Sequence, residues 1–169
     1  MADISMDTNV LADFLIQYFN TNTRSRFLLK ESCHITEIFC LRINSILNSH
    51  YRYEDTGVPP CGLLIASSAA FVELARKFSI IFKGCVTISQ FAAFIDSPPA
   101  FFTIEPLGFD ALRQLIQLPS VCKLGSDYRG IEAMDNLHVA TALVRENCVL
   151  AATDAKLIAA YGKGSYLLK

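Results

Sequence analysis

The sequence predicts an α/β fold: a three-layer sandwich in which helices flank both faces of a mostly parallel central sheet. Short apolar runs of strand length alternate along the chain with longer segments whose apolar residues recur every three or four positions, as on one face of a helix. Two of the short runs, GLLIA at 62–66 and CVLAA at 148–152, are apolar throughout. Such runs are typical of parallel strands that are buried on both faces.

The elements follow one another with local start and stop signals. The predicted strands are 4–6, 62–66, 101–105, 148–152 and 165–169. The predicted helices are 8–19, 35–47, 68–78, 88–95, 109–118, 129–146 and 154–161. Ser67 or Ser68 can cap the third helix, and Thr87 with Gln90 forms a capping-box pattern before the fourth. The polar stretch 48–62 contains two prolines and ends in glycine, which indicates a loop.

The size and composition of the chain predict a single domain over residues 1–169, with an insert at about 20–60. The 169 residues are 52% hydrophobic, which is enough material for one layered core. Charged residues make up only 18%, so we expect some apolar surface to remain for a homodimer contact.

Charge and cysteine usage exclude several classes of protein. The formal net charge of −1 predicts no overall basic surface for nucleic acid, so a polyanion would need a local patch or bound metal ions. The six cysteines include no CxxC pair and no zinc-ligand spacing with histidine. No apolar run reaches membrane-spanning length, and the first residues lack the features of a signal peptide. We therefore expect a cytoplasmic protein with no membrane partner.

Four acids occupy positions that suggest a shared site. Asp7 and Asp154 each follow a predicted strand, and ligands of parallel sheets bind beyond the carboxyl ends of strands. Glu73 and Asp135 lie on otherwise apolar predicted helices. Taken singly, each acid has an ordinary explanation as a helix cap or a solvated side chain. Four acids gathered at one end of a sheet would instead need a cation to balance their charge.

Three segments resemble the PIN-domain nuclease family, which includes the VapC-like toxin ribonucleases of toxin–antitoxin pairs. They are MDTNVLADFL at 6–15, AAFVELARKF at 69–78 and MDNLHVATALVRENCVLAATDAKL at 134–157. The last is the most specific, because it combines an Asp, a His three residues later, a helix of small residues, a strand and Thr-Asp. Glu73 follows Asp7 at a longer interval than in short toxin members, and the insert accounts for the difference.

The resemblance implies a metal-dependent endoribonuclease. In that family four acids hold Mg²⁺ or Mn²⁺ and cut phosphodiester bonds, and these acids match Asp7, Glu73, Asp135 and Asp154. The positions that support the site by hydrogen bonds match Thr8, Asn9 and Thr153. His138 matches a recurring family residue, with packing in its helix and contact with substrate as the two alternatives.

The expected partners are RNA and, for a toxin, an antitoxin protein that fills an apolar groove. Basic residues that could hold the RNA backbone are Arg24, Arg26, Lys30, Arg76, Lys77, Arg129 and Lys156. Two other functions stay open. One is a non-catalytic PIN module that acts as an RNA-binding or assembly surface. The other is a receiver-like or phosphatase-like α/β domain, and the receiver is disfavoured because Thr8 rather than a second acid follows Asp7.

Overall fold

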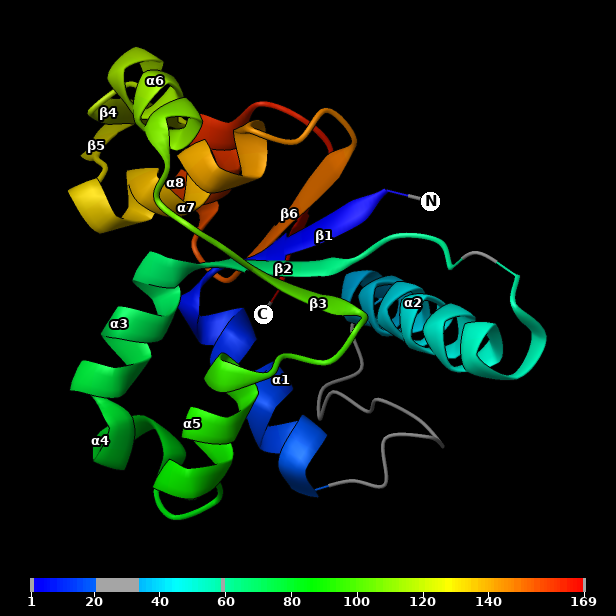
Figure 1. The fold of residues 1–169 in the computed structure, drawn as a ribbon. Coiled ribbons are helices and arrows are strands. Elements are labelled where there is room, and N and C mark those ends of the chain that lie inside the picture. The colour runs from blue at the N-terminus through cyan, green and yellow to red at the C-terminus, as the bar shows by residue number, and fades with distance from the viewer. Residues whose placement is uncertain (1, 21–33, 59, 169) are drawn as a thin grey trace.

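A five-stranded sheet with helices on both faces forms the body of the protein in the computed structural model, which describes residues 2–20, 34–58 and 60–168 (Figure 1). The strands of this sheet are β1 (Asp3–Met6), β2 (Leu64–Ser67), β3 (Phe102–Glu105), β6 (Cys148–Ala152) and β7 (Ser165–Leu167). All neighbouring strands are parallel, in the order β3-β2-β1-β6-β7. The predicted α/β sandwich is confirmed at this level.

The order of the strands creates a switch point beside β1. The chain starts in the middle of the sheet, builds β2 and β3 on one side, and later crosses to β6 and β7 on the other. Met6 pairs with Ala66 of β2 and with Ala151 of β6, so the carboxyl ends of these three strands lie side by side. Ligands of open parallel sheets bind in the crevice at such a point.

Helices cover the two faces of the sheet in separate groups. The helices on one face are α1 (Thr8–Asn20), α2 (His34–Thr56), α3 (Ser68–Arg76), α4 (Phe78–Phe82) and α5 (Ile88–Asp96). The other side carries α6 (Phe109–Gln117), α7 (Ala133–Leu143) and α8 (Ala155–Tyr161). Successive strand residues face opposite cores: Leu64 and Ala66 pack with the first group, whereas Ile65 packs with the second.

Two boundaries differ from the sequence predictions. Helix α2 continues to Thr56, so most of the stretch predicted as a loop is helical. Residues 52–56 at its end are all exposed, as expected for a helix that extends beyond the sheet, and no proline interrupts it before Thr56. The predicted helix 68–78 ends at Arg76, and α4 follows as a separate short helix.

A hairpin replaces the start of the predicted helix 129–146. Strands β4 (Val121–Leu124) and β5 (Asp127–Gly130) pair antiparallel around the two residues Gly125 and Ser126. Gly125 has a φ of 62°, which a two-residue hairpin turn requires and which glycine adopts without strain. Helix α7 therefore begins only at Ala133.

The remaining elements agree with the predictions to within about two residues. The capping box of α5 is present, with Thr87 and Gln90 bonded to each other's backbone. Residues 21–33 of the predicted insert lie outside the described part of the chain. No helix among the described residues combines the length and the apolar character needed to cross a lipid bilayer.

Candidate active site

Asp7 lies at the end of β1 and is buried, with 4% of its surface exposed. Its Oδ1 accepts a hydrogen bond from the Val10 amide at 2.8 Å, and its Oδ2 accepts one from the Thr153 amide at 3.0 Å. Burial raises the pKa of Asp7 to about 6, although these backbone bonds oppose the shift. The ionised carboxylate is therefore short of compensating charge, which a nearby cation would supply.

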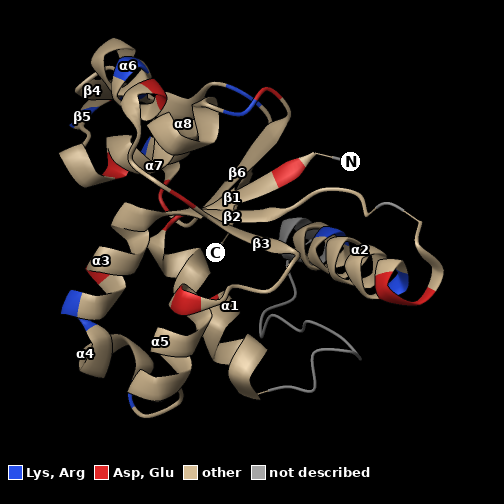
Figure 2. Cartoon of the chain, viewed as in Figure 1, with Lys and Arg blue, Asp and Glu red and all other residues tan. Residues whose placement is uncertain are grey.

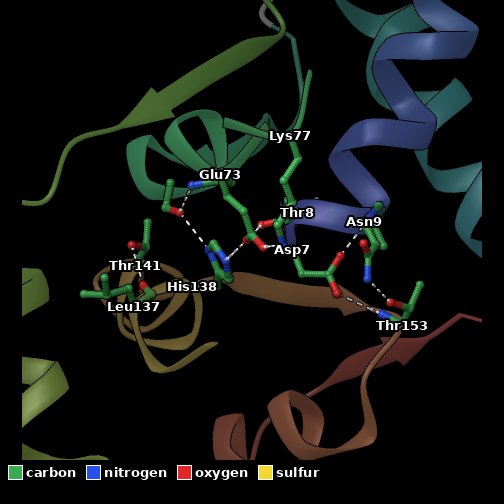
Figure 3. Close-up of polar contacts among 12 residues, drawn as sticks. Asp7, Thr8, Asn9, Glu73, Lys77, Leu137, His138, Thr141 and Thr153 are labelled. Atoms are coloured by element: carbon green, nitrogen blue, oxygen red, sulfur yellow. Dashed lines mark hydrogen bonds and ion pairs between the residues drawn. The ribbon is translucent and has the colours of Figure 1, made fainter. Parts of the chain in front are cut away.

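Glu73 approaches Asp7 from helix α3 and is held at both oxygens (Figure 3). The Thr8 hydroxyl donates to Oε2 at 2.7 Å, and the Lys77 ammonium donates to Oε1 at 2.9 Å. Burial by itself would raise the pKa of Glu73, but these two hydrogen bonds and the charge of Lys77 lower it overall. Glu73 is therefore ionised at neutral pH.

Asp135 and Asp154 complete the group from α7 and the start of α8. Asp154 is the N-cap of α8, and its Oδ1 accepts from the Lys156 amide at 2.8 Å. The Lys156 ammonium lies 3.4 Å from Asp154 Oδ2 and 4.0 Å from Asp135 Oδ2. Burial raises the pKa of Asp135, Lys156 lowers it, and the neighbouring Asp154 and Glu132 charges add to the increase.

All four acids line one small cavity of about 100 Å³ at the carboxyl edge of the sheet. Its lining is Asp7, Thr8, Asn9, Glu73, Asp135, His138, Asp154 and Leu157. The carboxylates come from four separate segments, and the sheet order brings them together at the switch point between β1 and β6. Every acid that the sequence singled out is therefore part of this cavity.

Thr8, Asn9 and Thr153, the expected supporting residues, lie at or beside the acidic cavity. The Asn9 amide donates to Thr153 Oγ1 at 3.0 Å, which links the start of α1 to the end of β6. His138 is 3% exposed and contacts both Thr8 and Ser67 by hydrogen bonds. His138 is therefore packed in its helix and also lines the cavity, and its contact with substrate stays a prediction.

A wider groove of about 400 Å³ adjoins the cavity and shares Glu73 and Asp135 with it. Its lining is Val72, Glu73, Arg76, Lys77, Glu132, Met134 and Asp135. The groove therefore offers apolar surface from Val72 and Met134 beside the guanidinium of Arg76. Within the described residues, no ion pair or hydrogen bond occupies the Arg76 side chain.

The remaining basic residues are spread over the molecule. Figure 2 shows Lys and Arg on several elements, including α2, α3 and α6. Arg24, Arg26 and Lys30 lie outside the described residues. Arg129 is on β5 and pairs with Asp127 at 3.3 Å. Of the expected RNA-binding residues that the structure describes, Arg76, Lys77 and Lys156 lie beside the acidic cavity or groove.

The donor atoms of the cavity suit a hard divalent cation. Carboxylate oxygens are the ligands that Mg²⁺ and Mn²⁺ prefer, and the residues around buried Asp7 compensate its negative charge incompletely, so a nearby cation would stabilise it. As the side chains now stand, no three His, Cys, Asp or Glu residues of the described chain are grouped closely enough to ligate one ion. The Lys156 ammonium instead lies between two of the acids.

Three residues had no clear signal for the site in the sequence. Ser67 is predicted only as a helix cap, yet it also contacts His138, 71 residues away. Glu132 and Met134 line the groove because α7 begins beside them, one turn later than the predicted helix. Their proximity to Asp135 in sequence is the only signal that could have indicated them.

The resemblance to PIN-domain nucleases rests on sequence segments of this chain and stays a prediction. Asp7, Glu73, Asp135 and Asp154 meet around one cavity at the switch point of a parallel sheet. Comparison of the chain with profiles of known protein families, with curated proteins and with solved structures finds no match.

Proposed function

We propose that this protein is a Mg²⁺- or Mn²⁺-dependent endoribonuclease of the PIN-domain type. The observation that carries the proposal is the convergence of four acids, from four separate segments, on one cavity of about 100 Å³. Gathering carboxylates in a partly buried place is unfavourable by itself, so such a cluster is typical of a cation site. Its place at the carboxyl edge of the sheet, where parallel sheets bind ligands, supports the same interpretation.

In this proposal Asp7, Asp135 and Asp154 hold the ion directly or through water, and Glu73 completes the site or orients the attacking water. The bound ion would supply an activated water and would stabilise negative charge on the phosphate and on the departing oxygen. Asn9 and Thr153 hold the ends of α1 and β6 together, which keeps Asp7 and Asp154 on the same side of the cavity.

The groove between α3 and α7 is the proposed path for the RNA strand. Arg76 would contact a backbone phosphate, while Val72 and Met134 offer apolar surface to a base. Replacing Arg76 by Gln should reduce the slope of log binding constant against log salt concentration by about one. Arg52→Gln on exposed α2 is the matched control and should leave the slope unchanged. An unchanged slope in the Arg76 variant would show that the RNA does not bind in this groove.

Cleavage itself is tested with purified protein and both structured and unstructured RNAs, with Mn²⁺ and with a chelator. We expect metal-dependent cleavage that the Asp7→Asn variant loses. Asp110→Asn is the matched control, because Asp110 is an exposed acid on α6 that pairs with Arg113 and does not line the cavity. Equal cleavage by wild type and the Asp7 variant would show that the acids do not form the active site.

One observation favours the second candidate, a non-catalytic PIN module that binds RNA or assembles with a partner. Lys156 and Lys77 already neutralise part of the acidic cluster, so the cluster does not strictly need a metal. This alternative predicts metal-independent RNA binding without cleavage. The cleavage assay separates the two functions, because added Mn²⁺ leads to cleavage of the RNA only if the protein is a nuclease.

The narrower role as the toxin of a toxin–antitoxin pair rests on the exposed apolar surface of α4 and α5. Ile80 and Ile88 are largely exposed and Ile95 is partly exposed, whereas Phe82, Phe91 and Phe94 on the same helices are buried in the core. This surface could take an antitoxin helix or a second copy of the chain. Co-purification with a small protein encoded next to this one supports the toxin role, and a homodimer alone supports self-association.

The proposed location is the cytoplasm. In the described part of the chain, Cys61, Cys85, Cys122 and Cys148 are free thiols. Free cysteines are expected in a reducing compartment.

A further inference from the structure

A chain of hydrogen bonds crosses the protein beside the acidic cavity and joins four elements (Figure 3). Ser67, at the end of β2, contacts Nδ1 of His138 on α7 at 2.8 Å. Nε2 of His138 contacts Thr8 Oγ1, at the start of α1, at 3.1 Å. Thr8 then reaches Glu73 on α3 at 2.7 Å. Three of these four residues are more than 90% buried, so water does not compete for the contacts.

Counting protons sets the direction of every bond in this chain. Glu73 is ionised and can only accept, so the single Thr8 hydroxyl proton is used on Glu73. Thr8 must therefore accept from His138, which requires a proton on Nε2. In a neutral imidazole Nδ1 is then an acceptor, and the Ser67 hydroxyl donates to it.

The hydrogen bonds of Ser67, the first residue of this series, agree with this direction. Ser67 is the N-cap of α3, and its oxygen accepts from the Ala70 amide at 3.2 Å. Its hydroxyl proton is therefore free to point at His138. Burial lowers the pKa of His138 to about 4, although the charge of Glu73 opposes the shift, so the ring is neutral at pH 7.

We propose that His138 is a positioning residue, held as the Nε2–H tautomer by Ser67, which aims the Thr8 hydroxyl at Glu73 and so fixes that carboxylate in the cavity. The other oxygen of Glu73 is held by Lys77, whose side chain is 57% exposed, so the buried chain is the stronger restraint. The catalytic consequence of this role rests on the proposed nuclease function, whereas the tautomer does not.

The tautomer is measured by the ¹⁵N chemical shifts of the His138 ring in labelled protein. The wild type should show one tautomer with the proton on Nε2. Ser67→Ala removes the donor to Nδ1 and should lower the fraction of the Nε2–H tautomer, while the contact with Thr8 continues to favour it. Thr87→Ala is the matched control, since it removes the N-cap of α5 without touching His138. A proton on Nδ1, or mixed tautomers in the wild type, overturns the proposal.

The positioning role is measured by the kinetics of RNA cleavage. His138→Leu removes the donor to Thr8 and should lower kcat by about 10- to 100-fold with little change in KM. His138→Gln, whose amide can donate to Thr8, should recover a substantial part of kcat. Equal losses of kcat in the two variants, with both folded by circular dichroism, overturn the positioning role. A wild type that binds no metal and cleaves no RNA overturns the nuclease proposal instead, and leaves the tautomer result standing.

Discussion

The two halves of the acidic cavity are built in different ways. In the first half, Asp7 is buried and bonded to two backbone amides, and Glu73 is held by Thr8. In the second half, Asp135 and Asp154 are partly exposed, and the side chain that links them is Lys156 at 3.4 and 4.0 Å. Short buried hydrogen bonds restrain geometry strongly, whereas long partly exposed ion pairs contribute little. The first half is therefore preformed, and the second half can rearrange around a ligand.

The largest expected effect comes from breaking the preformed half. Asp7→Asn keeps the size of the side chain but removes its charge, so RNA cleavage should fall on the order of 1000-fold. The amide can accept only one of the two backbone bonds, so the free energy of unfolding should change by no more than about 1–2 kcal/mol. Single-turnover cleavage and urea unfolding measure the two effects. A loss of stability much larger than this would mean that the variant reports on folding and not on the site.

The next effect is the pH dependence of stability. The pKa of Asp7 is raised from 3.8 to about 6, so the folded protein holds this proton more tightly than the unfolded chain. Stability from this group is present below pH 4, and it falls as pH rises from about 4 to 6, by about 3 kcal/mol in total. Urea unfolding without metal at pH 4 and pH 7 measures the change.

The Asp7→Asn variant isolates this contribution, because its residue 7 does not titrate. The fall in unfolding free energy between pH 4 and pH 7 should be larger in wild type than in the variant by about the same 3 kcal/mol. Identical pH profiles would show that the burial of Asp7 does not penalise its charge.

A smaller effect is expected in the adjustable half. Lys156→Gln removes an ammonium that competes with any cation for Asp135 and Asp154. Mn²⁺ should bind about two- to fivefold more tightly, as expected from the modest energy of a partly exposed pair. Titration followed by electron paramagnetic resonance measures the affinity. Lys163→Gln, an exposed lysine after α8, is the control, and weaker binding in the Lys156 variant would mean that this lysine organises the site.

The smallest effect is expected at the surface of the preformed half. Lys77→Gln removes an ion pair with Glu73 between residues four apart on α3, and the lysine is mostly exposed. The free energy of unfolding should change by less than about 0.5 kcal/mol. Cleavage should also be retained if the buried Thr8 contact is what fixes Glu73. A large loss of cleavage in the Lys77 variant would show that Lys77, and not His138, positions Glu73.

Much of the fold could be predicted from local patterns. The parallel strands appear as short apolar runs, and α5 has a capping box that forms as its sequence indicates. The predictions are wrong where the local signal is weak. The Gly125–Ser126 turn lies beside a segment with a helical pattern, and the end of α2 has the polar composition of a loop. Exposed polar residues suit a protruding helix and a loop equally well, so composition alone could not separate them.

The sequence predicts which acids belong to the candidate site, but it does not predict the hydrogen bonds and ion pairs that those acids make. Asp7 and Asp154 follow strands, so the position of each along its segment indicates the edge of the sheet on which it lies. The pairing of Lys156 with two acids, and the link from Ser67 through His138 to Thr8, have no local pattern.

By itself, the sequence determined most of the strands and helices, apart from the β4–β5 hairpin and the end of α2, and which acids lie at strand ends, because hydrophobic period and chain position are local properties. Only the tertiary structure decided which side chains meet. Thr8 and His138 are 130 residues apart and touch because β1 lies between β2 and β6 and α7 packs across these strands. The order of strands in a sheet depends on the packing of the whole chain, so no single segment encodes the contacts that it creates.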